Sequence, residues 1–403
     1  MLFSAAVLLA LLPAGLTAPS AGPLDKRAPL IQARSPAKVV PGKYIVKLKD
    51  GITDAAVNKA VGKYTASQVY KGVFKGFAGT FDAASLEAIR NLPDVEYVEE
   101  DAVFTINGIV TQTNAPWNLA RISRRTAPST SYRYDSTAGS GTCSYIIDTG
   151  VDTAHPQFEN RAFWGANFAG DGQNSDLNGH GTAAAGVVGA ITYGVAKKTK
   201  IIAVKVLNAS GSGSTSGVIS GMNWVVTDKA TRGCPNGTAA NMAIGGGFSA
   251  SVNAAARNMV NGGVFLSVSS GADNANAANY SPASEPLACT VAASTQADAA
   301  ASFSNWGSLI DIYAPGQNIL TTWIGGGTNT LSGTSMAAAH ITGLGAYLHT
   351  LRGSLTTAAQ MCPFIRSIAT QNVLTGVPTG TSNLLAYNGV DCNLSVAAPT
   401  CPQ

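Results

Sequence analysis

The chain has 403 residues, enough for two or three domains with a sizeable core. Charged residues make up only 12% of it, about half of the ~25% usual in soluble domains, and the net charge is +4. This charge is too small and too dispersed to indicate a nucleic-acid or membrane partner, and the aromatic residues are too scattered to form a base-stacking platform.

The N-terminus is short, apolar and followed by small residues, which is typical of a secretory signal peptide. We expect the signal peptide to span residues 1–18 and the protein to be secreted and extracellular. A buried N-terminal helix is the alternative, but Pro, Gly and Ser follow the apolar run at once. No other apolar run reaches the length of a membrane span, so we expect a soluble mature protein.

A small α+β unit follows. Residues 42–48 and 95–99 alternate polar with apolar side chains as half-buried strands do, while residues 53–65 and 83–92 carry helical spacing. Up to residue 110 about one residue in five is charged, and beyond it about one in eleven. This change predicts a domain boundary near residue 110, with Lys26-Arg27 as a candidate processing site upstream.

Beyond residue 110, short aliphatic runs alternate with helix-like stretches. The runs lie at 144–147, 201–206 and 263–268, and the helix-like stretches at 180–190, 214–231, 250–261 and 335–351. Such alternation predicts the α/β class, with a mostly parallel sheet covered by helices on both faces. Functional residues in such folds gather at the carboxyl ends of the strands.

Three residues in glycine-flanked contexts form a candidate catalytic set. Asp148 follows a predicted strand, and His180 and Ser335 each open a predicted helix. A serine hydroxyl becomes a nucleophile when an imidazole removes its proton and a carboxylate orients that imidazole. Each residue alone would more often be structural, but the order Asp, His, Ser is the one found in subtilisin.

The chain resembles the subtilisin-like serine proteases, and specifically the fungal proteinase K subfamily. Besides the three residues, the resemblance rests on four blocks: QTNAPW at 112–117, YGVAKK at 193–198, NYSPASEP at 279–286 and SFSN at 302–305. It implies a zymogen with a propeptide at 19–110, whose inhibitor domain spans about 42–105 and which is removed near residues 109–112. The peptidase domain would be 111–403, with a short C-terminal extension at about 390–403.

The resemblance assigns roles to individual residues. Ser335 would attack the scissile carbonyl, His180 would transfer the proton, and Asp148 would fix the imidazole tautomer. Two segments would bind an extended peptide between them as an added strand: Gly211-Ser212-Gly213 and Ile244-Gly245-Gly246. The expected partners are therefore protein or peptide substrates and the chain's own propeptide, and the enzyme is expected to be a monomer.

The resemblance also implies structural features. Catalysis would need no cofactor, but Asp311 with the carbonyls of Pro286 and Ala288 would bind a structural calcium ion. A second calcium site of the family would be lost, because Arg125 and Val373 occupy its positions. Six cysteines allow 15 pairings, of which the resemblance implies Cys143–Cys234 and Cys289–Cys362, with Cys392 and Cys401 left for each other.

Several positions depart from the family. Ala272 stands where an Asn donates a hydrogen bond to the oxyanion, Asp273 would repel that charge, and Asn274 could reach it only if the loop shifted by two residues. Other family residues are replaced by alanine at Ala183, Ala243, Ala338 and Ala339. Because alanine favours helices, we expect the scaffold to persist.

The retained Asp, His and Ser residues and the alanine substitutions around them leave two possible functions. The first is a secreted serine endopeptidase that works through an acyl-enzyme and is slowed by the loss of the oxyanion Asn. The second is an impaired pseudoprotease that binds peptides without turnover. An esterase would use the same nucleophile, and only its substrates would distinguish it.

Overall fold

The computed structural model describes residues 27–32, 39–102, 108–394 and 401. The chain folds into two compact units that follow one another near residue 103. The predicted signal peptide, Lys26 and most of the predicted C-terminal extension lie outside the described residues.

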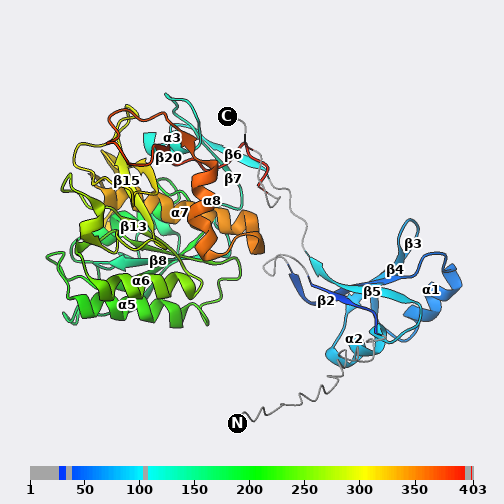
Figure 1. Cartoon of the computed structure of the whole chain (residues 1–403). Coiled ribbons are helices and arrows are strands. Elements are labelled where there is room, and N and C mark those ends of the chain that lie inside the picture. The colour runs from blue at the N-terminus through cyan, green and yellow to red at the C-terminus, as the bar shows by residue number, and fades with distance from the viewer. Residues whose placement is uncertain (1–26, 33–38, 103–107, 395–400, 402–403) are drawn as a thin grey trace, which may run out of the picture. The chain divides into compact units, whose positions relative to one another are not determined.

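The first unit is a five-stranded sheet with two helices, in the strand order β1-β5-β2-β4-β3 (Figure 1). Its elements are β1 (Leu30–Ile31), β2 (Val39–Leu48), α1 (Asp54–Val61), β3 (Ala66–Lys71), β4 (Lys75–Thr80), α2 (Ala83–Arg90) and β5 (Val95–Ala102). Thr53 and Asp82 cap the two helices by accepting hydrogen bonds from the third helical N–H, and inward side chains such as Phe77 and Val98 form the core. The predicted α+β unit is confirmed.

The second unit is built on a nine-stranded sheet in the order β19-β20-β16-β15-β13-β11-β8-β10-β9. All neighbouring pairs from β20 to β9 are parallel, and only β19 runs antiparallel to β20. The strands are β8 (Cys143–Asp148), β9 (Ala162–Asn167), β10 (Lys200–Lys205), β11 (Thr238–Met242), β13 (Phe265–Ser269), β15 (Cys289–Ser294), β16 (Ile312–Pro315), β19 (Thr370–Gln371) and β20 (Leu384–Leu385). The predicted α/β architecture is confirmed.

Helices cover both faces of this sheet because its central strands are apolar on both sides. In β8, Ile146 packs with α4 (His180–Gly189) and α7 (Thr334–Arg352). Its neighbours Tyr145 and Ile147 face the other way. They pack with α5 (Thr215–Asp228) and α6 (Ala250–Asn261), which Figure 1 shows side by side under the sheet.

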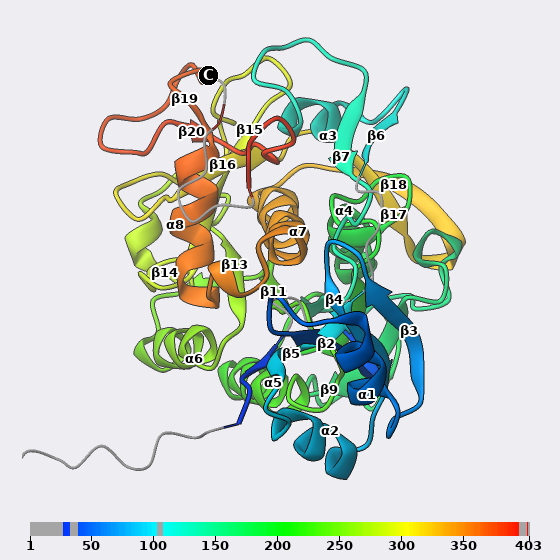
Figure 2. The same ribbon diagram turned by 90° about the vertical axis from the view of Figure 1, so that its right-hand side faces the viewer.

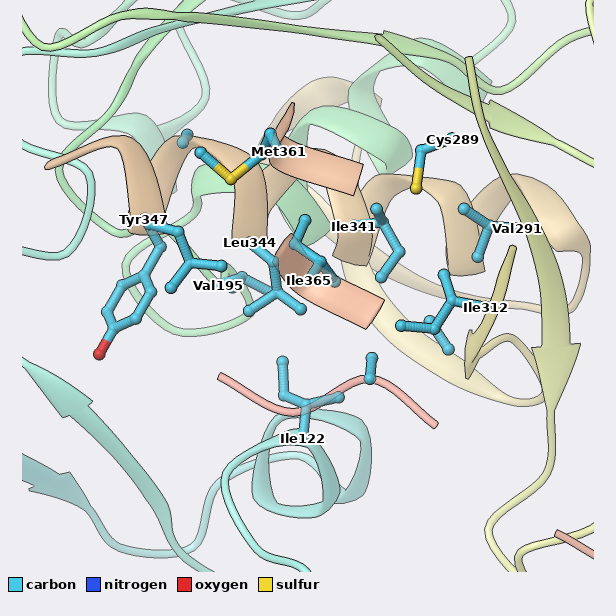
Figure 3. Close-up of a cluster of buried hydrophobic side chains, with 14 of the residues drawn as sticks. Ile122, Val195, Cys289, Val291, Ile312, Ile341, Leu344, Tyr347, Met361 and Ile365 are labelled. Carbon is cyan, nitrogen blue, oxygen red and sulfur yellow. The ribbon is translucent and has the colours of Figure 1, made fainter. Parts of the chain in front are cut away.

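The largest core lies around α7 and the later helix α8 (Ala358–Ile368) (Figure 3). Ile341 and Leu344 of α7 meet Met361 and Ile365 of α8 there, beside Ile122 at the end of α3 (Trp117–Ile122). Three disulfides are present: the pairs Cys143–Cys234 and Cys289–Cys362, which the resemblance implies, and Cys392–Cys401, the pair that remained.

Short elements complete the unit. They are the antiparallel pairs β6 (Ile109–Gln112) with β7 (Tyr132–Asp135), β12 (Gly246–Gly247) with β14 (Tyr280–Ser281) and β17 (Ile319–Trp323) with β18 (Gly327–Leu331), and the 3-10 turns η2 (Pro156–Phe158), η3 (Ala277–Asn279), η4 (Ile324–Gly326) and η5 (Gly353–Leu355). The β17–β18 hairpin lies beside α4 (Figure 2). β6 belongs to the second unit, so the boundary predicted near residue 110 falls inside a paired strand.

Among the residues that the structure describes, no helix combines the length and the apolar character that crossing a bilayer requires.

Candidate active site

The side chains of Asp148 and His180 are brought together by the sheet and the helix that follows it. Asp148 is the last residue of β8 and is fully buried, while His180 is the first residue of α4. Asp148 Oδ1 lies 2.8 Å from His180 Nδ1 and also accepts a hydrogen bond from the Thr149 N–H at 2.7 Å. The Asp148 carboxylate raises the pKa of His180, and burial of the ring partly opposes this effect. The pair can therefore stabilise an imidazolium.

A second buried carboxylate, which the sequence analysis missed, holds the start of α4. Asp176 Oδ1 accepts hydrogen bonds from Thr149 Oγ1 at 2.9 Å and Gly179 N at 2.8 Å, and also from Asn178 N. Its Oδ2 accepts from both N and Oγ1 of Thr182, at 2.9 and 2.6 Å. The available signal was an acidic residue just before a helix start, but nothing in the sequence showed the link to Thr149.

Ser335 is the second residue of α7, whose N-cap residue is Gly333. The hydroxyl of Ser335 donates a hydrogen bond to the carbonyl oxygen of Ala243 at 2.7 Å. Since a hydroxyl carries one proton, the hydroxyl is not donating to His180 in this resting arrangement. The second N–H of a helix has no partner within the helix, and Gly333 offers no side-chain cap. The Ser335 N–H is thus suited to bind a developing oxyanion.

The loop that would carry a second oxyanion donor is fixed next to α7. Thr334 Oγ1 donates to the Gly271 carbonyl at 3.1 Å, and the side chain of Asn305 accepts from the N–H groups of Asp273 and Ala275. Ala272 lies in this loop and is exposed. Its methyl group cannot donate a hydrogen bond.

Two polar residues, Asp273 and Asn274, follow Ala272 in this loop. The backbone of Asn274 is bonded on both sides, its N–H to the Phe303 carbonyl and its carbonyl to Trp306 Nε1. These bonds oppose the two-residue shift that would bring its amide into the oxyanion position. Desolvation and a hydrogen bond with Asp273 raise the pKa of Tyr280.

A cavity of about 520 Å³ joins His180 to both predicted substrate segments. All six predicted substrate residues line it: Gly211, Ser212, Gly213, Ile244, Gly245 and Gly246. Its apolar lining includes Leu207, Val218, Met242 and Val252, which the sequence analysis did not single out. Asn178 Nδ2 donates to the Ala209 carbonyl at 2.9 Å, so the loop before His180 is tied to the first segment. The cavity suits an extended peptide.

Three of the four alanine positions lie inside intact helices, and Ala243 directly follows β11. Ala183, Ala338 and Ala339 are fully buried, and α4 and α7 continue through them without interruption. Thr321 Oγ1 donates to the Ala183 carbonyl at 2.9 Å, and Ser267 Oγ donates to the Ala338 carbonyl at 3.0 Å. The helical scaffold persists through these positions, as expected.

The predicted calcium ligand Asp311 contacts a cationic side chain. Its Oδ2 accepts from the Thr290 N–H at 2.9 Å, and its Oδ1 lies 3.1 Å from Arg366 Nη1. Burial raises the pKa of Asp311 to about 6, against the effect of the Thr290 hydrogen bond and of Arg366. The nearby sulfurs of Cys289 and Cys362 form a disulfide, so they offer no thiolate to a metal.

Arg125, where the resemblance implies that a second calcium site is lost, donates to the carbonyl oxygens of Ile368 and Ala369 at 3.2 and 3.1 Å. Its guanidinium also lies 4.4 Å from the centre of the Tyr387 ring. Val373 packs among apolar side chains. A fixed positive charge on the carbonyls makes this position unsuitable for a cation.

Residues 139–388 match the model of the Subtilase family, and residues 43–107 match that of Peptidase inhibitor I9. The chain is 54% identical over 385 residues to a cuticle-degrading protease from Metarhizium anisopliae, with 95% of this chain and 98% of that protein covered. It is 51% identical over 389 residues to proteinase R from Parengyodontium album, with the same two coverages.

A solved structure, that of a cold adapted subtilisin-like serine proteinase, aligns with a TM-score of 0.65 at 41% identity. The alignment covers 68% of this chain and 99% of that one.

Proposed function

The chain belongs to the subtilase family and is a serine-type endopeptidase of the proteinase K type, and from this premise we propose that Ser335, His180 and Asp148 form its catalytic triad. The observation that carries the proposal is the 2.8 Å contact between Asp148 Oδ1 and His180 Nδ1 at the edge of the peptide-sized cavity. Ser335 shares this site through its bond to Ala243, which lines the same cavity as His180.

The residues support proton transfer in both directions. With Nδ1–H donated to Asp148, the neutral imidazole of His180 has Nε2 free to take the Ser335 proton as the hydroxyl attacks the scissile carbonyl. The proton then passes to the leaving amine, and water releases the acyl group by the same route. The raised pKa of His180 favours the imidazolium that exists between these steps.

Binding of substrate would bring the nucleophile into line. The Ala243 carbonyl holds the Ser335 hydroxyl in the resting state and lies where the peptide backbone would enter between the two segments. A Cβ atom at Gly246 or Gly247 would meet nothing within 4 Å, which leaves room for close approach of a peptide. Recognition of this kind depends on main-chain bonds and tolerates many sequences.

We expect turnover to be slow because the oxyanion site has one strong donor instead of two. In subtilisin, a relative, the loss of the corresponding donor lowers turnover about 100- to 1000-fold. Binding of peptides does not require that donor, so the pseudoprotease alternative differs from the slow enzyme only in the absence of turnover.

Maturation and secretion are also proposed. The first unit matches an inhibitor family, which supports its role as an intramolecular inhibitor removed near residues 109–112. The predicted signal peptide and the three disulfides are consistent with an oxidising, extracellular location. We expect the mature enzyme to be a monomer of about residues 111–403.

A structural calcium ion at Asp311 is a further part of the proposal. Asp311 supplies a carboxylate, and Pro286 and Ala288 lie just before β15, where their carbonyls are the hard oxygen donors that calcium prefers. One carboxylate and two carbonyls would leave most of the coordination to water. The ion would stabilise the loop and take no part in the reaction.

The test is peptide turnover by the secreted chain and two variants. Native turnover that disappears in Ser335→Ala and rises about 100-fold or more in Ala272→Asn supports a slowed serine peptidase. Turnover equal to that of Ser335→Ala, together with a retained propeptide, would refute it in favour of peptide binding. Parallel peptide and simple ester substrates would separate a peptidase from an esterase.

A further inference from the structure

The Asp311 carboxylate has a built-in cationic partner. Arg366 Nη1 lies 3.1 Å from Asp311 Oδ1, and the Thr290 N–H occupies Oδ2. The Asp311 side chain is 20% exposed and that of Arg366 is 43% exposed, so the pair lies at the surface with its acidic end largely covered. The guanidinium therefore occupies an oxygen that a metal at this carboxylate would need.

The fold holds Arg366 in this position. Cys362 and Arg366 are four residues apart on α8 and share one face of the helix. The Cys289–Cys362 disulfide ties that face to the start of β15, and Thr290, the next residue of β15, bonds Asp311. A covalent link and a main-chain bond thus bring the guanidinium to the carboxylate.

A guanidinium and a calcium ion cannot both lie against Oδ1. Calcium requires six to eight oxygen ligands, and a positive charge a few ångströms away repels a divalent ion. We propose that Arg366 is a tethered cation that competes with calcium for Asp311 and so weakens the affinity of this site for the metal. This inference rests on the calcium site proposed above.

A second arginine in the same unit also contacts oxygen atoms at a position where the resemblance implies a calcium site. Arg125 donates to the carbonyl oxygens of Ile368 and Ala369. Ile368 is the last residue of α8, the helix that carries Arg366. The two guanidinium groups are attached to different parts of the chain, so each observation stands without the other.

The test is a calcium titration of the full chain. Calorimetry measures the calcium affinity, and the midpoint of thermal unfolding measures the stability that the ion adds. Every protein carries Ser335→Ala, so that self-cleavage cannot change the sample. Arg366→Gln removes the charge and keeps a side chain that can donate hydrogen bonds. Arg366→Lys keeps the charge, and Arg133→Gln removes an arginine from another partly exposed ion pair, with Asp391, as a matched control. A double variant adds Asp311→Asn to Arg366→Gln.

We expect Arg366→Gln to bind calcium about 10- to 100-fold more tightly than the parent, and to gain about 3 °C or more in unfolding midpoint from the ion. The parent, Arg366→Lys and Arg133→Gln should each gain less than Arg366→Gln, and the double variant should lose the response. Equal calcium affinity in the parent and Arg366→Gln would overturn the competition while leaving the calcium site intact. If Arg366→Gln does not bind calcium, both the competition and the calcium site at Asp311 are overturned. The calcium measurements do not depend on peptidase turnover.

Discussion

Asp176 offers a test of how the histidine is positioned. Its two oxygens accept five hydrogen bonds, from Thr149, Asn178, Gly179 and twice from Thr182. In Asp176→Asn one oxygen becomes an NH₂ group that faces hydrogen-bond donors, so at least two bonds are lost. Bonds to a charged group contribute about 1.5–3 kcal/mol each before relaxation. We expect the free energy of unfolding to fall by about 2–4 kcal/mol.

The same substitution should change the acid–base behaviour of the enzyme. The negative charge of Asp148 is the main cause that raises the pKa of His180, and Asp176 adds to it. Activity requires neutral His180 as the base, so the rate rises as pH increases through that pKa. Removing the Asp176 charge lowers the pKa, and the acid limb of the pH profile should move to lower pH.

The assay is the pH dependence of kcat/KM for a peptide substrate, measured with urea unfolding of the same samples. Thr182→Val is the control, because it removes one hydrogen bond to Asp176 and keeps the carboxylate charge. We expect it to lose stability without moving the acid limb. An unchanged profile in Asp176→Asn, with only its stability reduced, would refute the positioning role.

Three further predictions concern stability. His340 and His349 are buried, and burial is the main cause that lowers their pKa values to about 4. Between about pH 6.5 and 4 the unfolded chain therefore binds more protons than the folded chain. The free energy of unfolding should fall as pH decreases through this range. His349→Phe should flatten that slope by about 1.4 kcal/mol per pH unit in urea titrations, and an unchanged slope would contradict this. Lys205 is fully buried, and its ammonium group donates hydrogen bonds to the carbonyl oxygens of Thr149 and Leu207. Lys205→Met should lower the free energy of unfolding by about 2–4 kcal/mol. An unchanged stability would contradict this and show that the two carbonyls find other partners. Replacing Cys289 and Cys362 together by Ala should lower the free energy of unfolding by about 4 kcal/mol. The disulfide closes a loop with a sequence separation of 73 and so limits the conformational entropy of the unfolded chain. A loss below about 1 kcal/mol would contradict this explanation.

Much of the fold follows from patterns visible in the sequence. The stretch predicted as a helix at 250–261 is α6 with the same bounds, and the aliphatic run at 144–147 lies inside β8. Both patterns are decided by local spacing of apolar side chains. Short elements such as β19 and β20 were not predicted, because two-residue strands form only where tertiary contacts supply their partners.

In the candidate site, too, features within short segments could be predicted and contacts between distant segments could not. Order, glycine-flanked context and the resemblance led to the prediction of Asp148, His180 and Ser335, and the first two of these features lie within short segments. The carboxylate of Asp176 and the contact between Arg366 and Asp311 join residues that only the folded chain brings together. The resting bond from Ser335 to the Ala243 carbonyl involves a backbone atom, for which a sequence carries no signal.

The central claim is that Ser335 is a nucleophile activated by His180. Its most direct test is covalent labelling of the secreted protein with a serine-reactive fluorophosphonate, followed by peptide mass spectrometry. We expect a single label on Ser335 that is slow to form in the native chain, faster in Ala272→Asn, and absent in His180→Ala. A label on another residue, or equal labelling of Ser335 with and without His180, would contradict it.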